Sequence, residues 1–255
     1  MKGLKKYFNN RVEKINQLLS RPGQKFTAAA FHHLRVEIKK LNALLEMINS
    51  CALHFRLKKS SRYTKQLFRL AGKVRELQLE EAMLKRYLPG RPKSGYLDHL
   101  KKLLSREKER FYLLLNPGFI NYLNMSWIEL LPYFDELNKK KLDHYLNDRQ
   151  KKIRELVLQK NLKVGQIHEL RKRLKQLDYN RKSLGLTSED KTQKSVVSIT
   201  DLLGKWHDCL VMTGHLQKAI HSGQLGEQEM GQIQRVKTKL IVKSKVLLGR
   251  IKSSI

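Results

Sequence analysis

Cysteine and long apolar runs are scarce in this chain of 255 residues, and each scarcity excludes a class of protein. Cys51 and Cys209 are too few and too isolated for a disulfide framework or a cysteine-based zinc site, so we expect two buried thiols. The longest apolar runs, such as 111–115, are far shorter than the roughly 20 apolar residues of a membrane-spanning helix. The basic start has no apolar stretch of signal-peptide length behind it, which predicts a cytoplasmic protein.

Acidic and aromatic residues are also in short supply. The chain has 53 Lys and Arg but only 23 Asp and Glu, a formal net charge of +30. A folded monomer carries such a charge only with an anionic partner or at a cost in self-repulsion. Aromatic residues make up 7 % and do not interleave with the basic ones, which argues against recognition of single strands by base stacking. Apolar residues reach 40 %, enough for the core of one large domain or two small ones.

Proline and glycine cluster at 21–23, 89–92, 116–118 and 223–226, and long segments between these clusters contain neither. Apolar residues in those segments recur three and four positions apart, as in Leu34, Ile38, Leu41, Leu45 and Ile48 and in Ile233, Val236, Leu240 and Leu247. This spacing predicts an all-α fold of about eight main helices with little β-structure.

Helix ends can be placed from single residues. Thr27 is a candidate N-cap, residues 187–190 resemble a capping box, and Gly185 can end the helix before that box. The lysine run 139–141 is interpreted as loop charge.

Three blocks occur twice, in the same order and at a nearly constant offset. Residues 7–18 match 145–156, 32–41 match 168–177, and 70–76 match 202–208. The matches predict two copies of one helical unit, joined between about 116 and 140. The copies, residues 1–118 and 119–255, are expected to be two pseudo-symmetric four-helix bundles within one compact domain.

The strongest functional signal is a basic stripe that occurs in both copies. It consists of His32, Arg35 and Lys39 in the first copy and of His168, Arg171 and Lys175 in the second. These positions fall within about 60° of arc on a helix, beside the apolar stripe, so each set can line a groove. A solvated helix face is the alternative, but such a face has no reason to keep the same cations in register after duplication.

A second basic set, Arg62, Lys65, Arg69 and Lys73, follows on the next expected helix, and only the ends of its pattern recur in the second copy. Gly72 and Gly204 inside helices indicate close approach of a neighbouring helix or a ligand. Glu76 and Asp208 are either partners that hold Lys73 and Lys205 or ordinary surface charges. The basic residues of 235–250 are either a solvated face or a rim of the same anion surface.

Enzyme motifs are missing from the sequence. It has no Walker loop, no dinucleotide-binding glycine pattern, no His-Glu-x-x-His and no serine or cysteine in a nucleophile context. Adjacent histidines such as His32 and His33 point about 100° apart on a helix, which makes a poor metal chelate. We therefore expect no catalysis, no metal and no cofactor.

The two His-x-Leu-Arg-x-x-[Ile/Leu]-Lys blocks resemble the CHAD family, the conserved histidine α-helical domain. The block that ends in Asp208 is similar to the family's second signature, although Arg75-Glu76 and His207-Asp208 each depart from its Arg-Asp by one residue. The resemblance implies two four-helix bundles around a basic central channel that binds inorganic polyphosphate without catalysis. Many members are fused to a triphosphate-hydrolysing tunnel domain, whose Glu-x-Glu-x-Lys signature is absent here, and members are associated with polyphosphate granules.

We therefore predict a non-catalytic polyphosphate-binding protein. Phosphate contacts are expected from His32, Arg35, Lys39, Lys73, His168, Arg171, Lys175 and Lys205, extended by Lys40, Arg69, Arg75, Lys172 and His207. The alternative is a nucleic-acid-binding module, with RNA favoured over DNA because no recognition-helix motif stands out. A phosphate-transfer enzyme, the third hypothesis, needs a metal-binding carboxylate cluster that the sequence does not suggest.

Overall fold

The computed structural model describes residues 2–20, 26–53, 55–56, 61–88, 95–159, 162–186, 191–222 and 225–254, with backbone alone for 191–198. The proline- and glycine-containing segments 21–23 and 89–92 and the predicted capping box at 187–190 lie outside the described residues.

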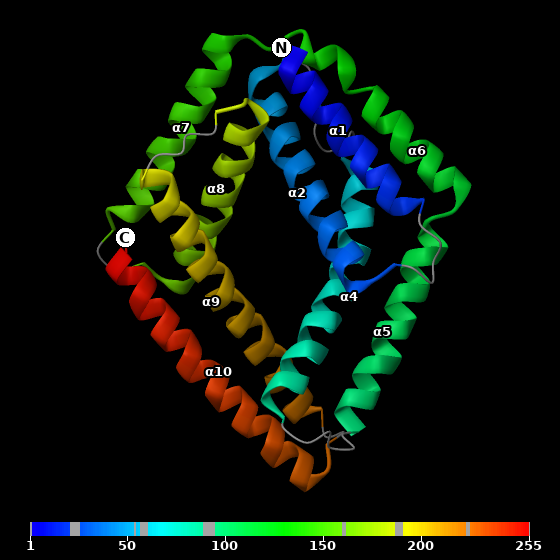
Figure 1. The fold of residues 1–255 in the computed structure, drawn as a ribbon, viewed down its shortest axis with the longest axis vertical. Coiled ribbons are helices and arrows are strands. Elements are labelled where there is room, and N and C mark those ends of the chain that lie inside the picture. The colour runs from blue at the N-terminus through cyan, green and yellow to red at the C-terminus, as the bar shows by residue number, and fades with distance from the viewer. Residues whose placement is uncertain are drawn as a thin grey trace. The chain divides into compact units, whose positions relative to one another are not determined.

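The described residues form α-helices joined by short connections, with no strand among them (Figure 1). The helices are α1 (Lys2–Leu19), α2 (Ala28–Cys51), α4 (Arg62–Tyr87), α5 (Gly95–Leu114), α6 (Pro117–Ile128), α7 (Lys139–Val157), α8 (Val164–Ser183), α9 (Lys191–His221) and α10 (Glu227–Ser254), with a 3-10 turn, η2, at Leu131–Phe134. The predicted all-α class is confirmed. Among the described helices, α6 occupies the segment that was expected to join the two copies.

Side chains set the helix ends where the sequence indicated. Thr27 caps α2 by accepting a hydrogen bond from the Ala30 amide, as predicted. Gly185 follows α8 with a φ of 72°, and the Leu186 amide donates to the Arg181 carbonyl, so Gly185 ends α8 as predicted.

The prediction that residues 139–141 form a charged loop is wrong, because α7 begins at Lys139. The side chain of Asn138 accepts a hydrogen bond from the Lys141 amide at 2.9 Å. This cap satisfies a donor of the first turn and so stabilises a helix start that the lysines disfavour through the helix dipole.

The chain divides into two compact units that alternate along the sequence. Unit 1 comprises Met1–Arg75, Arg106–Glu155 and Arg173–Thr187, and unit 2 comprises Glu76–Ser105, Leu156–Lys172 and Ser188–Ile255. The boundaries fall inside α4, α5 and α8 and near the end of α7. The two units are defined by packing, whereas the two copies were predicted from repeated sequence blocks. The copies therefore remain a prediction.

Unit 1 is built on the apolar stripe of α2. Leu34, Ile38 and Leu41 are fully buried, which confirms the predicted spacing. Beside them, the Phe31 ring lies 4.9 Å from that of Phe111, and α1 packs along α2 (Figure 1). The segment predicted to join the copies belongs to this core, because α6 buries Trp127, whose indole donates to the Thr64 hydroxyl at 3.1 Å.

Unit 2 is centred on α9 and α10, which run side by side in opposite directions (Figure 1). The α10 stripe predicted from spacing is buried, with Ile233, Val236 and Leu240 at most 2 % exposed. On α9 the bulkiest buried side chain is Trp206, 1 % exposed. Both cysteines are buried, as expected, Cys51 in unit 1 and Cys209 in unit 2.

Candidate functional site

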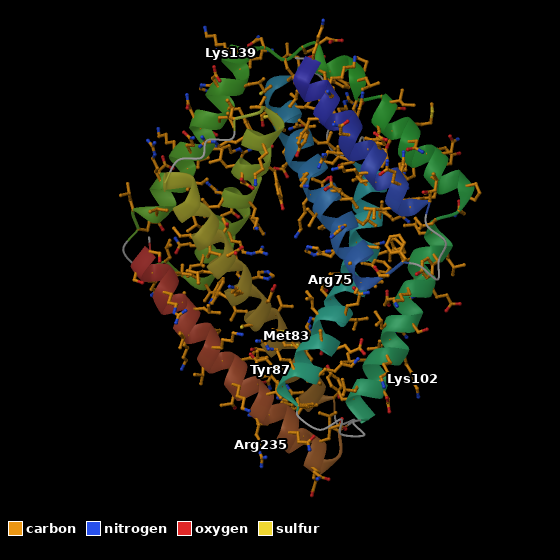
Figure 2. All side chains as sticks on the ribbon, in the orientation of Figure 1. Arg75, Met83, Tyr87, Lys102, Lys139 and Arg235 are labelled. Atoms are coloured by element: carbon orange, nitrogen blue, oxygen red, sulfur yellow. The ribbon has the colours of Figure 1, made fainter. Side chains whose placement is uncertain are left out.

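Basic residues of α2 and α4 gather in unit 1. On α2, His32 is exposed, and Arg35 and Lys39 are half-buried beside the apolar stripe. On α4, Arg69 and Lys73 are exposed. Arg75, labelled in Figure 2, is half-buried. We call His32, Arg35, Lys39 and Arg75 the α2–α4 cluster, because the last three lie close enough to His32 to lower its pKa. These four residues, Arg69 and Lys73 were all predicted from the sequence, and all six belong to unit 1.

Arg35 joins the two helices of the cluster. Its Nη1 donates a hydrogen bond to the Phe68 carbonyl of α4 at 3.3 Å, and its Cζ lies 4.4 Å from the centre of the Phe68 ring. The Arg35 guanidinium also lies against Gly72. A close approach at this glycine was predicted from the sequence. The guanidinium is therefore held against α4 by a hydrogen bond, a ring face and a residue without a side chain.

Several basic residues lie close to His32. Burial lowers the pKa of His32, and Arg75, His33, Lys39 and Arg35 lower it further by repelling the protonated ring. An anion placed among these groups would relieve their mutual repulsion and favour protonation of the ring.

Two buried carboxylates neutralise other cations of unit 1. Glu37, 8 % exposed, accepts from Lys40 at 2.7 Å and from Arg11 at 2.8 Å. Glu107 lies 4.0 Å from Lys73 and accepts from Arg110 at 2.9 Å. Lys73 is thus near Glu107 rather than Glu76, the partner that its sequence spacing suggested.

A second set of predicted residues comes together in unit 2. We call His168, Arg171 and Lys172 of α8 with His207 of α9 the α8–α9 cluster. The His168 ring lies 4.9 Å from the His207 ring, edge to face, and 5.0 Å from the Trp206 ring. Burial lowers the pKa of His168, and His207, Arg171 and Lys172 lower it further.

The details of the α8–α9 cluster differ from those of the α2–α4 cluster. Arg171 Nε is buried and has no hydrogen-bond partner in the described part of the chain. Lys205 is exposed, and the carboxylate of Asp208, its suggested partner, lies 3.7 Å from His207 Nδ1 instead. At Gly204 no described atom of another element lies within 4 Å of the position of an added Cβ, so no neighbouring helix approaches it, and the approach of a ligand stays a prediction.

Lys175, like Lys205, lies outside the α8–α9 cluster. It follows Arg171 by one helical turn on α8, is half-buried and belongs to unit 1. The predicted stripe of His168, Arg171 and Lys175 is therefore divided between the two units.

The sequence reasoning missed the residues that orient the cations. Phe68 and Trp206 provide the rings beside Arg35 and His168, and Glu107 provides the carboxylate near Lys73. Trp206 lies inside a repeated block and could have been noticed there. Phe68 and Glu107 carry no sequence signal, because their importance comes from a neighbouring helix.

The first helix of each predicted copy repeats a local contact. The Arg11 guanidinium lies 4.9 Å from the centre of the Tyr7 ring, and the Arg149 guanidinium lies 4.9 Å from that of Tyr145. Burial raises the pKa of Tyr7 to about 12, against the opposing effect of Arg11. These contacts support packing as the reason why this block recurs.

The described residues hold neither a metal-ligand cluster nor a membrane-spanning helix. No group of three or more His, Cys, Asp or Glu among them is placed to hold a metal ion. None of their helices is long and apolar enough to cross a membrane.

Comparison with known proteins shows the family and supports the fold. The family model described as the CHAD domain matches residues 12–217. The fold is similar to the crystal structure of the CHAD domain from the plant Ricinus communis, with a TM-score of 0.76, 16 % sequence identity and coverage of 99 % of this chain and 90 % of that one. It is also similar to PptA from Streptomyces chartreusis, with a TM-score of 0.70, 10 % identity and coverage of 99 % and 98 %. No curated protein matches the chain.

Proposed function

Since this chain belongs to the CHAD domain family, we propose that it binds inorganic polyphosphate without catalysis, through a basic channel between its two helical repeats. The observation that carries the proposal is the pair of cation clusters at corresponding sequence positions. In each, a histidine pKa is lowered by burial and by basic neighbours. Such clusters are favourable for an anion and costly without one.

The chemistry of polyphosphate suits these side chains. Its internal phosphates each carry about one negative charge, so a single chain can engage many cations at once. Arginine donates to two phosphate oxygens together, and lysine adds a mobile point charge. Binding releases counterions from the polymer, which makes affinity depend steeply on salt. Association with polyphosphate granules would be a consequence of this binding.

Replacing one arginine in each cluster tests the proposal. We expect Arg35→Ala/Arg171→Ala to weaken binding of long-chain polyphosphate by about tenfold or more, because each lost charged hydrogen bond is worth about 1.5–3 kcal/mol. The control is Arg86→Ala/Arg154→Ala, which removes the same charge from exposed positions outside the clusters. Isothermal titration calorimetry at constant salt measures both. Equal affinities for the two folded variants would contradict the residue assignment.

Competition distinguishes polyphosphate from RNA, the alternative ligand. Both polymers lose affinity as salt rises, so salt dependence alone does not separate them. We expect polyphosphate to displace a labelled RNA at equal phosphate concentration, and the opposite order would favour the nucleic-acid hypothesis. Shortening of polyphosphate chains by the protein with Mg²⁺ would instead indicate a phosphate-transfer enzyme.

A further inference from the structure

Arg35 occupies space that exists only because residue 72 is glycine. A Cβ added to Gly72 would clash with Arg35 Nη1 and would lie 3.3 Å from Arg35 Cζ. One turn earlier on α4, Phe68 holds the same guanidinium through its carbonyl at 3.3 Å and its ring at 4.4 Å. The far end of a long side chain is thus confined by two residues of a neighbouring helix, while Arg35 itself stays half-exposed.

The second sequence copy lacks this arrangement. Arg171 corresponds to Arg35, and Gly204 corresponds to Gly72, but Thr200 stands where the first copy has Phe68. The space over Gly204 is open with respect to the described atoms of other elements. Phe68 and Gly72 therefore hold the Arg35 side chain in a way that Thr200 and Gly204 do not reproduce for Arg171.

Confinement of a side chain changes how much free energy it contributes to ligand binding. A mobile arginine loses rotamer freedom when it binds phosphate, and that loss subtracts from affinity. A guanidinium already fixed against a helix has lost that freedom during folding. We propose that Gly72 and Phe68 are positioning residues that pre-organise Arg35 for its anionic ligand, so that Arg35 contributes more to affinity than Arg171. The inference rests on the proposed polyphosphate binding and deepens it.

Alanine at the two matched glycines provides the main test. We expect Gly72→Ala to weaken polyphosphate binding by about two- to tenfold, the range for ordering one long side chain on binding. The affinity of Gly204→Ala for polyphosphate should stay within about twofold of that of wild type, since the added Cβ meets no described side chain. Gly204→Ala raises helix propensity and should keep or raise the thermal midpoint. Gly72→Ala gains the same propensity but loses the contacts of Arg35 with Phe68, so its thermal midpoint should stay near that of wild type. Loss of binding without loss of stability is a result that a purely structural glycine would not produce.

A double-mutant cycle ties the effect to Arg35. In an Arg35→Ala background the Cβ of residue 72 no longer displaces a guanidinium, so Gly72→Ala should cause no further loss of affinity. An equal loss in both backgrounds would overturn the proposal. Phe68→Leu provides a second route, because it removes the ring and leaves the α4 backbone intact. It should weaken binding in the wild-type background and not in Arg35→Ala.

Failure of the inference and failure of the proposed function give different results. If Arg35→Ala weakens binding of polyphosphate but Gly72→Ala and Phe68→Leu bind like wild type, the positioning role is wrong and the function stands. If Arg171→Ala loses as much affinity as Arg35→Ala, the claimed asymmetry is wrong. If the wild-type protein binds neither long-chain polyphosphate nor tripolyphosphate, both the function and the inference are overturned.

Discussion

Glu37 and Glu107 divide the basic residues of unit 1 into neutralised and repelling groups. Glu37 receives Lys40 and Arg11, and Glu107 receives Arg110 and lies near Lys73. These cations already have a carboxylate partner, so an incoming phosphate must compete for them. His32 instead has a pKa lowered by burial and by positive neighbours. Basic residues of one helix, such as His32 and Lys40 of α2, therefore differ in what they offer an anion.

Binding of polyphosphate should be accompanied by proton uptake at His32 and His168. In the free protein the pKa of each ring lies below about 6.5, since burial and neighbouring cations disfavour its charged form. Bound phosphate favours the charged form and raises the pKa. Affinity for polyphosphate should therefore rise as pH falls from the bound-state pKa through the free-state pKa. Calorimetry in buffers of different ionisation enthalpy measures the protons taken up.

Histidine variants provide the control for this prediction. His32→Gln/His168→Gln should abolish most of the proton uptake, whereas His144→Gln, at an exposed position of α7, should retain it. Uptake that is the same in all three proteins would show that the protons go elsewhere.

Among the helices, the C-terminus of α8 gives a sharp test of local conformation. Gly185 has a φ of 72°, in the left-handed region, and ends the helix with the Leu186–Arg181 hydrogen bond. Gly185→Ala should lower the free energy of unfolding by about 1 kcal/mol, because a Cβ is strained there. Gly165→Ala, at the start of the same helix with open space around it, should be neutral or slightly stabilising. Chemical denaturation of both variants measures the difference.

A buried carboxylate ties three helices together within unit 2. Glu80 of α4, 3 % exposed, accepts from the Tyr96 hydroxyl of α5 at 2.5 Å and lies 2.7 Å from His215 Nδ1 of α9. The hydrogen bond to Glu80 raises the pKa of His215, Glu76 adds to the rise, and burial and Lys218 oppose it. Burial and the bond to Glu80 also raise the pKa of Tyr96.

This contact makes the stability of unit 2 depend on pH. The folded pKa of His215 lies above its unfolded value, so the stabilisation is complete below about 6.5 and is lost as pH rises through the folded pKa. Thermal midpoints should therefore fall over that window in the wild-type protein and stay flatter in His215→Gln. His221→Gln, at the exposed end of the same helix, should behave like wild type. A wild-type slope in His215→Gln would contradict the assignment.

At the scale of the whole chain, the net charge of +30 opposes folding. Without ligand, raising NaCl from about 50 to about 300 mM should raise the thermal midpoint, since salt screens the repulsion. Polyphosphate should raise the midpoint at low salt by binding the folded state, and this gain should shrink as salt weakens binding. Scanning fluorimetry at several salt concentrations, with and without polyphosphate, measures both trends. A midpoint that falls with salt in the free protein would contradict the argument.

Much of the fold could be predicted because the relevant signals are local. The stripe from Leu34 to Ile48 lies in the core, and Thr27 and Gly185 set helix ends, since periodicity and capping act within a few residues along one chain segment. The start of α7 was predicted wrongly because the lysine run was interpreted as loop charge, whereas the Asn138 side chain caps a helix there. Candidate cations were found by their recurrence in both copies.

The identity of the cations, their spacing along each helix and the excess of positive charge follow from the amino-acid order alone, because they need no knowledge of which helices meet. Packing between helices settled the rest. It placed Phe68 and Gly72 against Arg35, brought His207 to His168, and placed Glu37 beside Arg11 and Glu107 beside Lys73. Each of these contacts joins residues of different helices, and the distance between such residues is a property of the folded chain.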